Sequence, residues 1–288
     1  MIDYHLHLWS HSKPSTEATI EQLAAYCEKA AGNGVTEIAI TEHFYRFREA
    51  SALLKGFFHR YDASPVRSLM EEYWERNSTA DLDQYVEVGL AAKKAGLPVV
   101  LGLEVDYYEG EMAGVAALLS GYPFDVLLGS IHWIQAWPFD HVDDPVVMAE
   151  WERVGVEPAW QGYTRALEEL AASETVDVLA HPDLVKVAGH RPAVPEEYYD
   201  RMAEAAASHS MTAEVSSAGR RKPVNEIYPA PYLLDRFRAL GIGVTTASDA
   251  HGLGDVADRA GELSQALKVA GYEELTRFSG RKPRATAL

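Results

Sequence analysis

Short apolar, β-branched runs alternate with amphipathic helical segments along most of the chain, and this alternation limits the possible folds more than any other feature. Seven runs are present: IDYHLH at 2–7, TEIAIT at 36–41, PVVLGLEV at 98–105, FDVLLGSI at 124–131, VDVLA at 176–180, MTAEVS at 211–216 and GVTTAS at 243–248. Between two of them, DLDQYVEVGLAAKKAG at 81–96 has apolar residues at helical spacing, with Asp81 placed to cap its start and Gly96 to end it. Strands that alternate with helices indicate parallel βαβ units with right-handed crossovers.

Seven such units in 288 residues favour a closed or nearly closed α/β barrel over an open dinucleotide-binding sheet, because no G-x-G-x-x-G turn follows the first run. No linker-like tract divides the chain, so we expect residues 1–288 to form one domain. Two connections, 44–80 and 133–160, are unusually long. Both follow strand ends, so we expect them on the active-site side, either as pocket walls and lids or as packed helical elaborations.

Composition excludes several classes of function. The formal net charge of −17 would repel a phosphodiester backbone, so nucleic acid is not an expected partner. No apolar run approaches the ~20 residues of a membrane helix, and no basic, apolar leader is evident. Cys27 is the only cysteine, in the predicted helix TIEQLAAYCEKAA, where Thr19 and Gln22 form a possible capping box; we expect it to pack in the core. These features predict a cytoplasmic enzyme.

Imidazoles and carboxylates gather at the ends of the apolar runs. Side chains alternate along a strand, so His5 and His7 are expected to point the same way, although this pair alone is also typical of a polar strand face. The residues at or just past the run ends are His5, His7, His43, Glu104, His132, His181, Glu214, Asp249 and His251. The carboxyl ends of parallel strands share one face, so these ligands for Zn, Mn or Fe should converge. Their number implies two or three divalent transition-metal ions, with Glu104 as a natural bridge.

The segments GLEVDY at 102–107, GSIHW at 129–133 with WPFD at 137–140, HPDLVK at 181–186 and EVSSAGRRKPVNEIYP at 214–229 are more specific. With them the chain resembles the PHP (polymerase and histidinol phosphatase) family, and within it the histidinol-phosphatase branch, from residue 1 to about residue 265. The resemblance implies a single-domain, distorted (β/α)7 TIM-like barrel with a trinuclear metal centre at the C-terminal ends of its strands.

The resemblance also implies how the ligands are shared. One ion would be held by His5, His7, Glu104 and Asp249; a second by Glu104, His132 and His181; and a third by His43, His251 and a residue of the loop after the first strand. His11 is expected to be that loop ligand, but its spacing departs from the family pattern, so Glu17 or a vacant third site stays open. Glu104, Asp249 and His251 are expected to take part in the reaction itself.

The implied reaction is hydrolysis of L-histidinol phosphate to L-histidinol and phosphate in histidine biosynthesis. Arg221, Lys222 and Lys186 are expected to bind the small phosphorylated substrate, with Arg191 as a further candidate. Asp106 and Asp183 lie beside the predicted site in a catalytic, orienting or purely structural role. Two alternatives remain open: a PHP phosphoesterase for another small metabolite or nucleotide, and a non-catalytic metal-binding or regulatory protein. The sequence gives no prediction of the oligomeric state.

Overall fold

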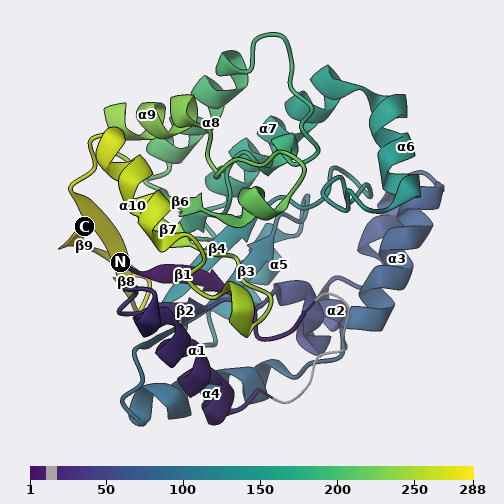
Figure 1. Cartoon of the computed structure of the whole chain (residues 1–288). Helices are drawn as coiled ribbons and strands as arrows, with labels where there is room; N and C mark the ends of the chain where they lie inside the picture. The colour runs from purple at the N-terminus through teal and green to yellow at the C-terminus, as the bar shows by residue number, and fades with distance from the viewer. Residues whose placement is uncertain (11–17) are drawn as a thin grey trace.

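A computed structural model of the chain describes residues 1–10 and 18–288. Its centre is a seven-stranded parallel sheet in which the strands follow one another in sequence order (Figure 1). The strands are β1 (Asp3–Leu6), β2 (Ile38–Ile40), β3 (Val99–Asp106), β4 (Val126–Ser130), β5 (Val178–Leu179), β6 (Thr212–Ser216) and β7 (Val244–Ala247). Each strand lies inside one of the seven predicted apolar runs, except that β3 extends one residue beyond its run, to Asp106. The predicted barrel-type α/β fold is therefore confirmed.

Helices surround the sheet in Figure 1. They are α1 (Ile20–Gly32), α2 (Arg48–Leu53), α3 (Pro65–Asn77), α4 (Leu82–Lys94), α5 (Met112–Leu119), α6 (Pro145–Val154), α7 (Val156–Ala172), α8 (Glu196–Ser208), α9 (Pro231–Ala239) and α10 (Ala260–Val269). Short 3-10 turns are η1 (Phe44–Arg46), η2 (Phe57–Arg60), η3 (Leu184–Lys186), η4 (Ala218–Arg221) and η5 (Leu253–Asp255). Every residue of β1 to β7 is buried, as expected for a parallel sheet covered on both faces. Within the described ranges, no helix has both the length and the apolar character that crossing a membrane requires.

The starts of α4 and α1 show which of the predicted helix-capping residues form hydrogen bonds. Asp81 caps α4 by accepting a hydrogen bond from the backbone N–H of Gln84, as predicted. Thr19 likewise caps α1 by accepting from the backbone N–H of Gln22 at 3.2 Å. The Gln22 side chain, however, does not complete a capping box, because its Nε2 donates to the carbonyl oxygen of Leu8 at 2.7 Å. This bond connects α1 to the loop that follows β1.

The seam between β1 and the residues after β7 nearly closes the barrel. The backbone N–H of His7 donates to the carbonyl of Ala250 at 2.8 Å, and that of Asp249 donates to His5 at 2.9 Å. Below these bonds, the fully buried carboxylate of Asp3 accepts from the Ser248 backbone N–H and hydroxyl and from the Ala257 N–H, at 2.7–2.8 Å. The seam therefore places the end of β7 beside the end of β1.

The chain ends in an antiparallel hairpin of β8 (Glu274–Ser279) and β9 (Lys282–Ala287), which the sequence analysis did not predict. Its turn donates backbone hydrogen bonds to Asp125, from Gly280 N–H and Arg281 N–H. Arg281 also donates to the Thr175 carbonyl and to Asp177. These partners precede β4 and β5, so the hairpin covers the N-terminal ends of the strands. The C-terminal ends stay clear of it.

The two long connections meet each other. The 44–80 connection contains η1, α2, η2 and α3, and the 133–160 connection contains α6 and the start of α7. Helices α3 and α6 pack side by side, as Figure 1 shows. Helix α3 also contacts η1, which follows β2.

The closing role of Asp3 predicts a stability effect. We expect Asp3→Ala to lower the free energy of unfolding by about 3 kcal/mol, because three buried donors lose their acceptor. Urea unfolding followed by circular dichroism measures this change. Asp62→Ala, at an exposed aspartate, is the matched control and should have little effect. Equal unfolding midpoints for the two variants would contradict the role given to Asp3.

Candidate metal centre

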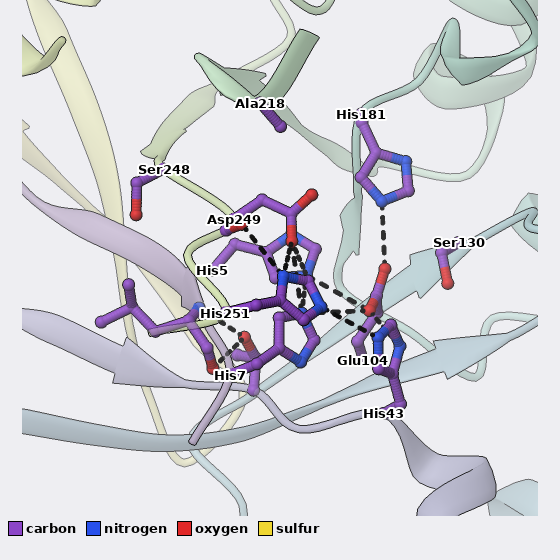
Figure 2. Close-up of polar contacts among 12 residues, drawn as sticks. His5, His7, His43, Glu104, Ser130, His181, Ala218, Ser248, Asp249 and His251 are labelled. Carbon is purple, nitrogen blue, oxygen red and sulfur yellow. Dashed lines mark hydrogen bonds and ion pairs between the residues drawn. The ribbon is translucent and has the colours of Figure 1, made fainter. Parts of the chain in front are cut away.

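Six of the seven strands deliver polar side chains to one place, from within the strand or just past its C-terminal end. β1 and the residue after it provide His5 and His7, and β3 provides Glu104 from within the strand. The other members follow strand ends, and Figure 2 shows them with their polar contacts: His43 after β2, His181 after β5, and Asp249 and His251 after β7. His132, after β4, joins the same group. The convergence expected from the sequence is therefore present in the geometry.

Glu104 lies at the centre of this group and is fully buried. Its Oε2 lies 2.7 Å from His43 Nδ1, 3.3 Å from His5 Nε2 and 3.5 Å from His7 Nε2. Its Oε1 lies 3.0 Å from His181 Nε2 and 3.4 Å from His132 Nε2. The two oxygens thus face two different sets of imidazoles, as a bridging carboxylate would.

Asp249 is the second carboxylate of the group that is surrounded by imidazoles. Its Oδ1 lies 3.3 Å from His7 Nε2, 3.6 Å from His251 Nδ1 and 3.8 Å from His5 Nε2. Asp249 has a φ of +50° and His181 a φ of +27°, a backbone region that residues other than glycine rarely adopt. Such strain tends to be kept at functional sites, where the surrounding structure enforces it.

A second layer of carboxylates holds the imidazoles from behind. Glu214 Oε2 lies 2.8 Å from His5 Nδ1, and its Oε1 accepts the backbone N–H of His181 at 3.1 Å. Asp106 Oδ1 lies 2.6 Å from His132 Nδ1. Glu42 Oε2 lies 3.6 Å from His7 Nδ1, while its Oε1 accepts the N–H groups of Leu8 and Trp9. Such outer carboxylates fix the ring orientation of a histidine ligand and raise its basicity.

An orienting role was among the sequence-based possibilities for Asp106, but none was assigned to Glu42 or Glu214. Glu42 stands inside the TEH motif, directly before His43, and Glu214 had been recognised only as a strand-end residue. The signal available was their position at strand ends. That position alone does not tell which carboxylate faces the centre and which stands behind an imidazole.

The electrostatics of the cluster favour an ionised Glu104. Burial opposes its ionisation, but the imidazoles of His5, His132 and His43 outweigh that effect and hold the pKa of this carboxyl well below its ordinary value. Burial lowers the pKa of His132, whereas Glu104, Asp106 and Asp140 together raise it to about 10. The cluster therefore contains a carboxylate that is charged at neutral pH and surrounded by groups that stabilise that charge.

The donor set fits transition-metal ions. Glu104 Oε2 is buried, and imidazole nitrogens of His43, His5 and His7 lie 2.7–3.5 Å from it. His5 Nε2 and His7 Nε2 face each other at 3.1 Å, and His43 Nε2 and His251 Nε2 at 3.4 Å. Three-residue sets with ligand atoms within 4.8 Å of one another are His5, Glu104 and His181; His5, His7 and Asp249; His7, His43 and His251; and His43, Asp106 and His132. Imidazole nitrogens and carboxylate oxygens converging in this way are the ligands that Zn, Mn and Fe accept.

A cavity of about 240 Å³ opens over the cluster. Its floor includes His43, His132, His181, Asp249 and His251. The 44–80 connection contributes Tyr45, Met70 and Tyr73 to its walls, and the 133–160 connection contributes Trp133, Pro138, Asp140 and His141. The side after β6 and β7 contributes Ala218, Arg221, Lys222, Tyr228 and Asp255, and Leu184 comes from η3. Both long connections thus reach the space above the strand ends.

Two of the three expected phosphate-binding cations line this cavity, and the third does not. Arg221 donates to the carbonyls of Ser248 and Asp249 at 2.6 and 3.0 Å, which fixes it beside the cluster. Lys222 lines the cavity and is exposed. Lys186, in contrast, is fully buried outside the cavity lining.

The partners of Lys186 correct the expectation that it binds substrate. Its Nζ lies 2.8 Å from Asp183 Oδ2 and donates to the Ile227 carbonyl at 2.9 Å. Asp183 also accepts the Ala230 backbone N–H, so these groups connect η3 to the segment before α9. Arg191, the further candidate, is paired with Glu226. The pair of Asp183 and Lys186 is therefore a structural contact.

The loop after β1 contains the remaining expected ligand. His11 and its alternative Glu17 lie outside the described residues, so their positions are not given by the structure.

Comparisons with known proteins agree with this geometry. A family model described as PHP domain matches residues 5–218. The chain is 31% identical, over 258 residues, to the probable histidinol-phosphatase of Deinococcus radiodurans, covering 89% of this chain and 90% of that relative.

Two solved structures share the fold. The histidinol phosphate phosphatase of Lactococcus lactis subsp. lactis, complexed with zinc, L-histidinol and phosphate, has a TM-score of 0.70 and 21% identity, with 98% of each chain covered. The putative histidinol phosphatase of Listeria monocytogenes has a TM-score of 0.73 and 20% identity, covering 91% of this chain and 99% of that chain.

The second layer of carboxylates generates a prediction. We expect Glu214→Gln to weaken transition-metal affinity by roughly 10- to 100-fold, because an amide holds His5 less well than a carboxylate does. Competition with a chromogenic chelator measures the affinity. Glu204→Gln, at an exposed position of α8, is the control. Wild-type affinity in the Glu214 variant would contradict the orienting role.

Proposed function

The chain belongs to the PHP domain family, and we propose that it is a metal-dependent phosphomonoesterase that hydrolyses L-histidinol phosphate to L-histidinol and phosphate in histidine biosynthesis. The observation that carries this proposal is Glu104, which is held between five imidazoles beneath a cavity with basic, acidic and aromatic walls. The names of the Deinococcus relative and of the two structural neighbours support the same substrate.

The proposed cofactors are two or three divalent transition-metal ions, Zn, Mn or Fe. Their ligands would be His5, His7, Glu104 and Asp249 for the first, Glu104, His132 and His181 for the second, and His43, His251 and a residue of the loop after β1 for the third. When bound, such ions supply Lewis acidity that polarises phosphoryl oxygens and lowers the pKa of a water molecule. The zinc in the Lactococcus structure is consistent with this choice.

The chain's own residues would bind and orient the substrate. Arg221 and Lys222 would neutralise the phosphoryl oxygens, because both line the cavity on the side of Asp249. Tyr45, Tyr73 and Trp133 would enclose the organic part of the substrate and exclude water. Asp249 and His251 belong to the cluster and also line the cavity, so we propose that they act with Glu104 in the reaction itself.

The proposal has consequences for organisation and partners. It treats residues 1–288 as one barrel domain, with 44–80 and 133–160 as parts of the active-site wall. It places the enzyme in the cytoplasm, with a small phosphorylated molecule as its partner. The net charge of −17 is unfavourable for a nucleic-acid partner.

Steady-state kinetics of the metal-replete protein tests the function. We expect kcat/KM for L-histidinol phosphate to exceed that for sugar and nucleoside phosphates by about 100-fold, because groups built to bind one substrate reject molecules that lack its polar features.

Chelation should abolish turnover, and re-addition of Zn, Mn or Fe should restore it. Glu104→Gln should lose most activity while the circular dichroism spectrum stays unchanged.

Two outcomes would replace this function by one of the alternatives. Equal or better hydrolysis of another phosphate ester would assign a different substrate to the same site. Fewer than about two bound ions per chain together with no turnover would favour a non-catalytic metal-binding protein.

The different surroundings of two lysines generate a separate prediction. Lys222→Ala should raise KM roughly tenfold without lowering stability, because loss of one charge-assisted contact to phosphate weakens binding. Lys186→Ala should instead lower the free energy of unfolding by about 3 kcal/mol, because it leaves Asp183 buried without its ion-pair partner. Kinetics and urea unfolding measure the two effects, with the exposed Lys268→Ala as control. The reverse pattern would contradict the placement of both lysines.

A further inference from the structure

Three aspartates line the cavity, and two of them have evident partners. Asp249 is part of the imidazole cluster, as described above. Asp255 approaches Arg221, with Oδ2 at 4.0 Å from Nε. The third is Asp140, the last residue of the WPFD segment, and it forms no ion pair with any residue that the structure describes.

The carboxylate of Asp140 is also only partly exposed to water. Its Oδ1 is buried and has no hydrogen-bond partner within the described part of the chain. A buried carboxylate oxygen without a donor is unfavourable, because it has lost water and gained nothing in exchange. Asp140 also lines the cavity, so its carboxylate is within reach of a cation or a hydrogen-bond donor that arrives with a ligand.

The loop that carries Asp140 is held against α6 by two hydrogen bonds. The indole N–H of Trp137 donates to the Val147 carbonyl at 3.2 Å, and that of Trp151 donates to the Phe139 carbonyl at 3.0 Å. The carbonyl of Asp140 itself accepts the backbone N–H of Val142 at 2.9 Å. The carboxylate is thus positioned before any ligand binds, which lowers the cost of using it for recognition.

The cavity is lined by charged groups of both signs. Arg221 and Lys222 lie on one wall, where they suit a phosphoryl group, and Asp140 lies on the wall made by the 133–160 connection. Tyr73 and His141 line the cavity too, and their rings are in edge contact at a centroid distance of 5.1 Å. Aromatic faces near a carboxylate are a favourable environment for an ammonium group.

We propose that Asp140 is the specificity-determining residue that binds the primary ammonium group of the substrate. This inference rests on the proposed function, in which the substrate is an amino alcohol phosphate. In L-histidinol phosphate the ammonium is carried by the carbon next to the CH2–O–P group, so one molecule presents an anion and a cation a few bonds apart. Asp140 supplies the charge complement at the cationic end, and Arg221 and Lys222 supply it at the anionic end.

The test compares two substrates that differ only in the ammonium group: L-histidinol phosphate and its deamino analogue, 3-(imidazol-4-yl)propyl phosphate. We expect Asp140→Asn to lower kcat/KM for L-histidinol phosphate by about 100-fold, the usual scale for breaking a desolvated, hydrogen-bonded charge pair. The same variant should change kcat/KM for the deamino analogue by less than about threefold. Inhibition by L-histidinol should weaken in parallel, which reports binding without turnover.

Asp143→Asn is the matched control, because it makes the same chemical change at an exposed aspartate of the same loop. Wild-type-like kinetics of Asp143→Asn with both substrates, alongside selective loss in Asp140→Asn, would support the proposal. Equal losses on the two substrates, or no loss on either, would overturn it. The wild-type kinetics separate the proposed function from this inference. A wild-type protein that does not prefer L-histidinol phosphate over sugar and nucleoside phosphates overturns both. A preference that Asp140→Asn leaves intact overturns this inference alone.

Discussion

The rest of the site depends on one buried carboxylate, that of Glu104, which must be stabilised by positive charge. It lies at the carboxyl end of the longest strand of the sheet, and its backbone N–H donates to the carbonyl of Glu42 at 2.9 Å, which fixes it against the neighbouring strand. A carboxylate removed from water at this depth is unstable unless cations surround it. Five imidazoles from four strands or strand ends provide that environment, and the proposed metal ions would complete it. The barrel is the arrangement that lets all five reach one point.

Much of this fold follows from the sequence because parallel strands leave a simple signature. The runs around β1 to β7 were found from apolar patterning, and α4 was found from helical spacing with Asp81 and Gly96 as its limits. The resemblance to the PHP family, drawn from motifs, is confirmed by the family model and by the Deinococcus relative. The β8–β9 hairpin was missed because β9 is largely exposed and its partner is antiparallel, so neither an apolar run nor a strand–helix alternation marks it. Its place under the barrel depends on long-range contacts to Asp125.

The site was less predictable than the fold. Placement at strand ends brought His132 and Asp249 correctly to one face, because the carboxyl ends of parallel strands share an edge. The same reasoning was wrong for Lys186. A side chain in the turn after β5 can point either toward the cavity or into the protein interior. In η3 its side chain turns inward to Asp183, three residues earlier, instead of toward the cavity. Side-chain direction in a short turn is decided by local partners that one-dimensional patterning does not reveal.

The buried carboxylates of the barrel differ in how fully they are hydrogen-bonded. At the N-terminal ends of the strands, Asp125 accepts from Lys93, from the backbone N–H of Leu101 and from the turn of the hairpin. Asp3, in the seam, accepts three hydrogen bonds. Above the C-terminal ends, Asp106, Asp140 and Asp183 each have a buried oxygen without a hydrogen bond to the described residues, and Glu104 is surrounded by imidazoles. Of these carboxylates, Glu104 lies in the imidazole cluster and Asp140 lines the cavity, so these two are placed to receive groups that the polypeptide does not supply. The same fold therefore concentrates stability at one end and unsatisfied negative charge at the other, where a cation-dependent site requires it.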